Sequence, residues 1–269
     1  ISSMVGLKPP EKCSSLVVRW EEDLVYQFHN EDFTAMEVLI LNAEFNGHPP
    51  LLCMPYQCQL WGSGPGLNGC KIGTTNNGQH LKVVWGCPKQ VVQGMAMLAR
   101  SLKEAEAWAA MSPVSVPTHY IFVCGETREV ISLFVSNFAA SHCEVKLHKI
   151  REQSFCFTNH VPEGWLSLKM SDPALVNSPT SVPRYNMLNS LTPEELPRTL
   201  QEGIDLFSNQ NKKNVLFRVA ENAGESGTIA TLGICAKEGE MWIRDADLTA
   251  EKRDWRFVLQ DGHFVLIDE

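Results

Sequence analysis

A cysteine at the junction of two predicted elements is the first candidate for chemistry. Cys87 lies between Gly86 and Pro88, after the apolar run Leu81–Trp85 and before a long helical pattern. We therefore expect Cys87 where a strand ends and a helix begins. The N-terminus of a helix stabilises anions and lowers the pKa of a thiol. Cys87 is a candidate catalytic thiolate on this argument.

The next predicted strand offers a matching position. Gly125 and Thr127 follow the apolar run Thr118–Cys124, as Cys87 follows the first run. Ligands in open α/β sheets bind outside the carboxyl ends of the strands. The sequence thus predicts a small-molecule site lined by Gly86, Cys87, Gly125 and Thr127. The alternative is an ordinary strand–helix corner with a buried thiol.

A second set of residues resembles the catalytic residues of chymotrypsin-like serine proteases. Residues 224–227 read Gly-Glu-Ser-Gly, and residues 138–143 read Phe-Ala-Ala-Ser-His-Cys, similar to the segments around the serine and histidine of that family. The resemblance covers only these few positions. It implies Ser226 as nucleophile, His142 as base and Asp172 as the carboxylate that orients the base. A hairpin turn of small polar residues is the alternative.

Two further patterns concern metals and phosphates. Four nitrogen and sulfur ligands that could hold zinc lie close in sequence, namely Cys143, His148, Cys156 and His160. Their spacing matches no zinc module, so we predict no metal. Gly64, Gly66 and Gly69 satisfy the G-x-G-x-x-G pattern, which binds phosphate through the helix that follows it. Here a strand pattern follows, so we predict a flexible surface loop and no cofactor.

The predicted elements around Cys87 alternate between strands and helices. In chain order they are a strand at 81–85, a helix at about 88–111, a strand at 118–124, a helix at about 127–140 and a strand at 143–150. The apolar spacing of Val130, Phe134 and Phe138 favours the second helix, although a β-branched run also fits a strand. Such alternation is typical of parallel strands joined by crossover helices.

The flanking regions predict antiparallel strands. Runs at 15–20 and 23–29 fit a hairpin in a β-rich N-terminal region. Thr192 and Glu195 predict a capped helix at 191–211. Five later strands, with Asp-Gly between the last two, predict an antiparallel meander at 214–221, 228–236, 241–246, 255–260 and 263–269. The fold class is then mixed α/β–α+β. The proline-rich segment 162–183 suggests a boundary, giving domains 1–180 and 181–269.

Composition narrows the class of protein. The chain has 269 residues, 44% of them hydrophobic, which predicts a sizeable core. A net charge of −8 argues against general nucleic-acid binding, and no apolar run is long enough for a membrane span. Nine cysteines without a paired-spacing pattern fit reduced thiols. No signal-peptide pattern is seen at the start, so we expect a cytoplasmic or nuclear protein.

The function predicted from these observations is an intracellular protein–protein interaction or assembly module with a protein partner and no catalysis. Its support is the absence of a dense catalytic or phosphate-binding pattern. One alternative is an enzyme or small-molecule-binding protein that uses the strand-end crevice near Cys87 and Gly125. A second is the serine protease implied by Ser226, His142 and Asp172.

Overall fold

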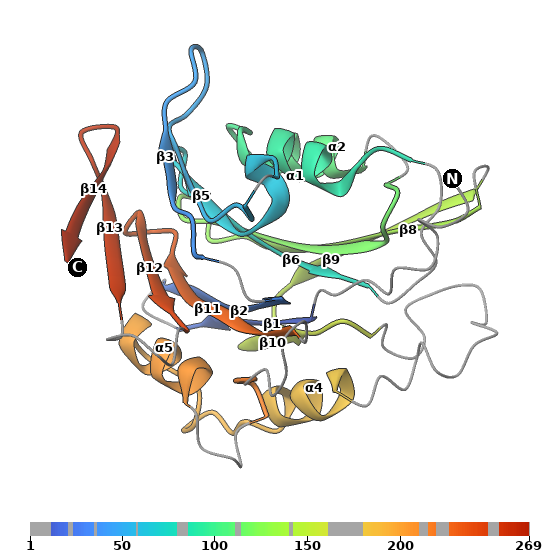
Figure 1. Cartoon of the computed structure of the whole chain (residues 1–269), viewed down its shortest axis with the longest axis vertical. Coiled ribbons are helices and arrows are strands. Elements are labelled where there is room, and N and C mark those ends of the chain that lie inside the picture. Colours follow the sequence, from blue (N-terminus) through green and yellow to red (C-terminus); the bar gives the residue numbers. More distant parts are fainter. Residues whose placement is uncertain are drawn as a thin grey trace.

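Two antiparallel β-sheets packed face to face form the centre of the molecule, and helices cover the outer face of each sheet (Figure 1). The structure, a computed structural model, describes residues 12–20, 24–34, 37–57, 59–79, 86–110, 114–139, 142–160, 180–209, 215–218, 226–246 and 253–268. Its layers run helix, sheet, sheet, helix. Among the described helices, none is long and apolar enough to cross a membrane.

Each sheet has seven strands, and every neighbouring pair is antiparallel. Sheet A has the order β10 (Ser154–Phe157), β1 (Lys12–Arg19), β2 (Val25–Thr34), β11 (Ser226–Cys235), β12 (Glu240–Asp245), β13 (Asp254–Gln260) and β14 (His263–Asp268). Sheet B has the order β3 (Leu41–Ala43), β4 (Leu51–Cys53), β5 (Gly66–Asn68), β6 (Ile72–Gly78), β7 (Thr118–Cys124), β8 (Val130–Ala139) and β9 (His142–Ile150).

Five short helices complete the described structure. Sheet B is covered by α1 (Lys89–Met97) and α2 (Leu102–Ala110), and sheet A by α4 (Ser181–Asn189) and α5 (Leu200–Ser208), as Figure 1 shows. A 3-10 turn, η2 (Trp61–Ser63), packs against α1. Three apolar cores fill the spaces between the four layers.

The alternation of side chains on β7 shows how one strand serves two cores. Ile121 and Val123 belong to the core between the sheets, whereas Tyr120 and Phe122 belong to the core beneath α1 and α2. All seven residues of β7 are buried. A strand buried on both faces reads as a continuous apolar run, which is usually a sign of a parallel sheet. Here the second sheet, rather than a second layer of helices, covers the other face.

The predicted parallel β-α-β-α-β unit is therefore wrong. The strands at 118–124 and 143–150 exist but pair antiparallel with a strand between them. That strand is β8, which occupies the segment predicted as a helix at 127–140. Its Val130 faces the core between the sheets, and Ile131, Leu133 and Val135 face the helices, a period of two. The strand predicted at 81–85 lies outside the described residues.

Other predicted elements differ in extent. The helix at 88–111 is divided into α1 and α2 by residues 98–101. Of the helix predicted at 191–211, α5 covers only Leu200–Ser208. Its N-cap is Thr199, whose side-chain oxygen accepts from the Glu202 N–H at 3.1 Å. Thr192 and Glu195 still interact, but in a turn before Pro197. The glycine-rich segment is buried between residues 62 and 68 and is no surface loop.

Sheet A combines strands from the N-terminal and C-terminal parts of the described chain. The hairpin expected near the N-terminus is present as β1 and β2, and four strands of the C-terminal meander are present as β11 to β14. The fifth, predicted at 214–221, is wrong where the structure describes it, because residues 215–218 are not in a strand. Strand β2 pairs with β11, so sheet A contains strands from both sides of the boundary predicted near residue 180. No disulfide links the cysteines of the described part of the chain, namely Cys13, Cys53, Cys70, Cys87, Cys124, Cys156 and Cys235.

Helix α5 approaches sheet A closely at a glycine. A Cβ atom on Gly203 would lie 2.0 Å from Cε1 of Phe28, so the ring fills the space of a side chain. Alanine normally favours a helix over glycine by about 1 kcal/mol. Gly203→Ala is nevertheless expected to destabilise the protein, by about 1–3 kcal/mol, because the added methyl group overpacks the core. Urea unfolding measures this change, and Gln201→Ala, at an exposed position of the same helix, is the matched control. A stabilised Gly203→Ala variant would contradict the packing described.

A buried histidine joins the two sheets. His119 of β7 stacks on Phe157 of β10, with ring centroids 3.6 Å apart, and its Nε2 lies 2.6 Å from Ser132 Oγ. Burial lowers the pKa of His119 to about 3. In the unfolded chain an imidazole binds a proton below a pH of about 6.5. The unfolded state thus gains a proton that the folded state does not, and stability falls as the pH drops from about 6.5 towards 3.

Acid is expected to weaken the fold through His119 by about 2–3 kcal/mol at pH ~4.5 relative to pH ~7.5. His119→Gln removes this proton uptake, so its free energy of unfolding should fall less between these two pH values. Urea titrations at both pH values give the difference. His148→Gln, at a half-exposed ring, should keep the full acid sensitivity. An equal pH dependence for the His119 variant and the unchanged protein would show that His119 does not carry the effect.

Candidate functional site

The polar ends of β1 and β2 form a buried cluster between the layers. Strand β1 begins with polar residues and continues as Leu-Val-Val, while β2 begins apolar and continues as His-Asn-Glu-Asp. Antiparallel pairing sets Cys13 opposite Glu31 and Ser15 opposite His29. All four residues are buried. Buried polar groups of this density are usually hydrogen-bonded to one another, and these are.

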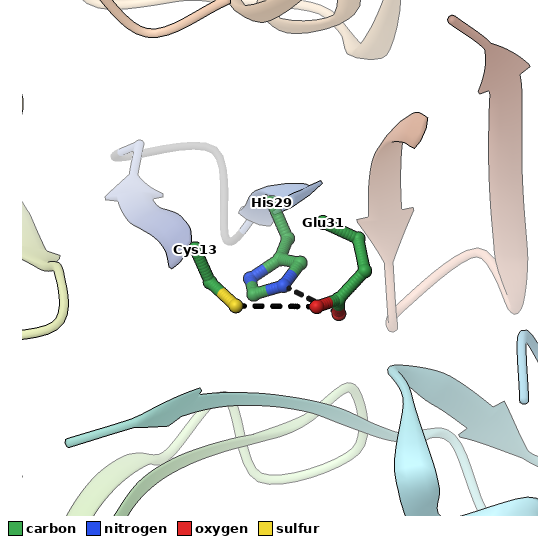
Figure 2. Close-up of side chains that lie close together, drawn as sticks. All are labelled: Cys13, His29 and Glu31. Carbon is green, nitrogen blue, oxygen red and sulfur yellow. Dashed lines mark hydrogen bonds and ion pairs between the residues drawn. The ribbon is translucent and has the colours of Figure 1, made fainter. Parts of the chain in front are cut away.

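Three of these side chains point toward one another on the face of sheet A that is turned to sheet B (Figure 2). The Cys13 thiol donates to Glu31 Oε1 at 3.2 Å, and His29 Nε2 lies 3.1 Å from Glu31 Oε2. One ligand atom from each residue lies within 4.8 Å of the other two. The group therefore combines a potential nucleophile, a carboxylate and an imidazole.

Glu31 is held in its charged form. Burial by itself raises the pKa of this carboxyl, but His29, the Tyr56 hydroxyl and the positive charge of Lys89 together bring it below its ordinary value. Tyr56 donates its hydroxyl hydrogen to Glu31 Oε1. Lys89, the buried first residue of α1, donates from Nζ to Asn76 Oδ1 at 3.4 Å.

Sheet B closes the cluster with amide and hydroxyl groups of β6. Ser15 Oγ donates to Asn77 Oδ1 at 2.8 Å and lies 2.8 Å from His29 Nδ1. Gln27 donates to Thr75 Oγ1 at 2.8 Å. The Nδ2 group of Asn77 is buried and has no hydrogen-bond acceptor among the described residues. It is an N–H donor available to a ligand next to the cluster.

The main chain of Cys13 is anchored by a buried arginine. Arg184 of α4 donates to the carbonyl oxygen of Cys13, to Ser14 Oγ at 2.7 Å and to Asn159 Oδ1 at 2.8 Å. The same Asn159 oxygen accepts the Cys13 N–H at 2.7 Å, and Asn159 donates to Gly78 O at 2.8 Å. This network joins α4, β1 and the end of β6, so it fixes the position of Cys13.

A carboxylate on the helix-facing side of β2 completes this network. Asp32 Oδ1 accepts from Thr228 Oγ1 at 2.7 Å, and Oδ2 lies 3.9 Å from Arg184. Oδ2 accepts no hydrogen bond from the residues that the structure describes. Burial raises the pKa of Asp32 to about 6, although Arg184, Thr228 and Arg218 act in the opposite direction.

The residues of the predicted strand-end site are not brought together. Cys87 is half-buried and forms an isolated bridge with Val114, before β7 begins. Gly86 precedes it, whereas Gly125 and Thr127 lie in the turn after β7 ends. The two groups are thus separated by the length of the strand. At Gly125 an added Cβ would lie 2.3 Å from the carbonyl oxygen of Ala236, so close packing accounts for this glycine.

The protease-like residues are distributed over both sheets. His142 begins β9 at the edge of sheet B, and Ser226 begins β11 in sheet A. Their side chains and the whole of Asp172 lie outside the described residues. His142 is in a strand and not at the end of a helix, because the segment before it is β8.

The four predicted zinc ligands also separate. His148 lies on β9 of sheet B with its ring near Glu152, and Cys156 lies on β10 of sheet A with Sγ 3.9 Å from Tyr185 O. His160 contacts Ser181, with 2.9 Å between Nδ1 and Oγ. The side chain of Cys143 lies outside the described residues. The glycines of the phosphate-loop pattern do not precede a helix. Gly64 and Gly66 are buried against Met54 and Cys53, and strands β5 and β6 follow Gly64.

The sequence analysis missed the cluster of Cys13, His29 and Glu31. A signal was present in the four consecutive polar residues at 29–32, which lie within β2 and are all buried. Polar residues at buried positions are uncommon, and perturbed titratable groups cluster at functional sites. Pairing this run with Cys13 requires the predicted hairpin of 15–20 and 23–29 to extend beyond both predicted strands, as β1 and β2 do.

Comparison with known proteins identifies the fold. No family model matches the chain, and no curated protein matches it closely in sequence. The conjugated bile acid hydrolase from Clostridium perfringens, in a variant with a cysteine replaced by alanine, has a TM-score of 0.55 and 12% identity over 96% of this chain and 97% of that chain. A variant of the same enzyme with an arginine replaced by leucine has a TM-score of 0.56 and 12% identity, with the same coverage of 96% and 97%.

The N-acylethanolamine-hydrolyzing acid amidase ortholog from Caenorhabditis elegans has a TM-score of 0.54 and 10% identity over 84% of this chain and 93% of that chain. The fold thus resembles the Ntn-hydrolase fold of these proteins. These neighbours carry the names of hydrolases, so the comparisons contradict the expected non-catalytic interaction module. The cluster of Cys13, His29 and Glu31 does not include Cys87 or Gly125, the residues of the predicted strand-end site.

Proposed function

We propose that this protein is a cysteine-dependent amide hydrolase in which the Cys13 sulfur is the nucleophile. The observation that carries the proposal is the position of this sulfur. It lies near the start of β1, 3.2 Å from the Glu31 carboxylate and in one cluster with His29. A thiol needs an adjacent base to act as a nucleophile, and this arrangement supplies one.

The structural neighbours support the choice of bond. Two carry the name of a hydrolase for conjugated bile acids, and the third is named an amidase for N-acylethanolamines. One of these structures is of a cysteine-to-alanine variant. Amide substrates with an apolar acyl group are therefore the first class to test.

The reaction has two halves. The thiolate sulfur attacks the amide carbonyl carbon, a C–S bond forms and the carbonyl oxygen becomes negative. Collapse of this intermediate breaks the C–N bond, and the amine leaves with a proton. Water then attacks the thioester, which releases the carboxylic acid and restores the thiol. The buried Nδ2 group of Asn77, which has no acceptor among the described residues, is a candidate donor to the negative oxygen.

Two groups could take the thiol proton. One is the Glu31–His29 pair. The other arises if the chain is cut before Cys13, because its nitrogen then becomes an α-amino group beside its own thiol. Asn159 Oδ1 already accepts from this nitrogen at 2.7 Å, and the Asp32 Oδ2 atom is a second candidate acceptor for an ammonium group. Cys13 is 1% exposed, so an amide can reach its sulfur only after a change that uncovers it.

Trapping the acyl-enzyme tests the proposal. The protein is incubated with conjugated bile acids, N-acylethanolamines and a fluorogenic N-acyl amide, quenched in acid and digested. We expect amine release from at least one substrate, and the acyl mass on the peptide that contains Cys13. An acyl group on another residue would refute Cys13 as the nucleophile.

Intact-mass measurement separates the two bases. If the α-amino group is the base, activity should follow the fraction of chains that begin at Cys13. A preparation that keeps Lys12 and hydrolyses amides at the same rate would assign the base to Glu31 and His29.

A further inference from the structure

Cys13, His29 and Glu31 also have the geometry of a metal site. Their ligand atoms comprise one thiolate sulfur, one imidazole nitrogen and one carboxylate oxygen, a set that zinc binds readily. These atoms lie within 4.8 Å of one another, and all three residues are buried. We propose that these three residues bind a zinc ion, and that the ion blocks the nucleophile. The blocking step rests on the proposed function, whereas the binding step does not.

The distances fit zinc without a rearrangement of the strands. Zinc bonds of about 2.0–2.3 Å in a tetrahedron place neighbouring ligand atoms roughly 3.3–3.6 Å apart. The sulfur of Cys13 lies 3.2 Å from Glu31 Oε1, and Nε2 of His29 lies 3.1 Å from Oε2. The two distances end on the two oxygens of one carboxylate, so small side-chain rotations bring the sulfur, the nitrogen and one oxygen to three corners of a tetrahedron. The fourth position remains for water.

The backbone holds these ligands rigidly. Cys13 and Glu31 are direct partners across the β1–β2 ladder, and His29 is two residues before Glu31 on the same face. Ligands on paired strands are positioned more accurately than ligands on loops.

Neighbouring groups orient the ligands as metal sites require. Ser15 Oγ lies 2.8 Å from His29 Nδ1, which leaves Nε2 directed at Glu31. Tyr56 donates to the Glu31 carboxylate. A hydrogen bond to the second ring nitrogen and one to the carboxylate are the usual outer contacts of a zinc site.

The charges balance when zinc is bound. The ion carries two positive charges, and the thiolate and the carboxylate carry one negative charge each, with a neutral imidazole. A buried site of zero net charge avoids the cost of an unpaired buried ion. Binding displaces the thiol proton to solvent, since the thiolate is the ligand. The sulfur lone pair then bonds to zinc and cannot attack a carbonyl carbon.

Cobalt substitution gives a readout that does not depend on hydrolysis. The purified, metal-stripped protein is titrated with Co²⁺, and a thiolate-to-cobalt charge-transfer band is recorded in the near ultraviolet. We expect one ion per chain and loss of the band in Cys13→Ser. In His29→Gln we expect metal affinity to weaken by at least about tenfold. Cys70→Ser changes a cysteine outside the cluster and should keep the band. Circular dichroism checks that each variant is folded.

Zinc inhibition is measured in parallel with the amide hydrolysis assay. We expect equimolar Zn²⁺ to stop hydrolysis and a chelator to restore it. Metal binding that persists unchanged in folded Cys13→Ser and His29→Gln would overturn the zinc site. Hydrolysis that continues when one zinc ion is bound would overturn the blocking step. A cobalt band without hydrolysis of any amide would uphold the metal site and refute the proposed function. Hydrolysis without metal binding would uphold the proposed function and refute the metal site.

Discussion

Replacing Cys13 with alanine is expected to reduce amide hydrolysis by at least about a thousandfold. The sulfur is the only atom of the cluster that can form the thioester, and neither Glu31 nor His29 can replace it. Initial rates with the substrate that gives the fastest amine release measure the loss. Stability should change little, because alanine keeps the backbone contacts of Cys13 with Arg184 and Asn159.

The matched control is Cys87→Ala, which tests the cysteine that the sequence pattern favours. Cys87 lies by the bridge to Val114 and outside the polar cluster, so this variant should keep the rate of the unchanged protein within about twofold. A large loss in Cys87→Ala together with an active Cys13→Ala would return the active site to the strand-end crevice. Burial raises the pKa of the Cys53 and Cys156 thiols to about 12, so neither is expected to react near neutral pH.

Arg184→Met is expected to lower the free energy of unfolding by about 3–5 kcal/mol. The side chain of Arg184 is fully buried and donates to four acceptors, which belong to Cys13, Ser14, Asn159 and Thr180. Methionine fills much of the same volume but removes the nearer positive charge from the Asp32 carboxylate and leaves only the weaker effect of Arg218. Urea unfolding at neutral pH measures the change. Arg198→Met, at an exposed arginine that stacks on Trp20, is the control and should cost less than about 1 kcal/mol.

A double-mutant cycle separates the charge from the hydrogen bonds. In Arg184→Met combined with Asp32→Asn, the buried charge is gone, and the asparagine Oδ1 still accepts from Thr228. The double variant should therefore be more stable than the sum of the two single changes predicts. Strict additivity would show that Asp32 and Arg184 do not interact and that Arg184 acts through its hydrogen bonds to other residues.

Much of the candidate site could be inferred from local sequence, although the sequence pattern did not predict its residues as functional. The hairpin of β1 and β2 is a short-range feature, and once its register is known Cys13 faces Glu31. Arg184 is different. Its contact with Cys13 spans 171 positions in the sequence, and no local pattern connects α4 to β1. Cys87 was predicted as the candidate thiolate only because of its neighbours in sequence.

The error in fold class has one physical origin. Local sequence reports how far each face of a strand is buried, and β7 and β8 are buried on both faces. A parallel sheet between two helical layers produces this pattern, and so does an antiparallel sheet between helices and a second sheet. The apolar spacing of Val130, Phe134 and Phe138 fits a helix and a strand about equally well. Only the partner strands decide between them.

The sequence by itself determined which segments are apolar and where the N-terminal hairpin and the C-terminal meander form. The tertiary structure decided the direction of the strands in sheet B and the pairing of β2 with β11. It also decided the convergence of Arg184, Asn159 and Asn77 around Cys13. The reason is that side-chain periodicity is a property of neighbouring residues. Strand direction and buried hydrogen bonds depend on distant partners, whose contacts form only when the layers pack together.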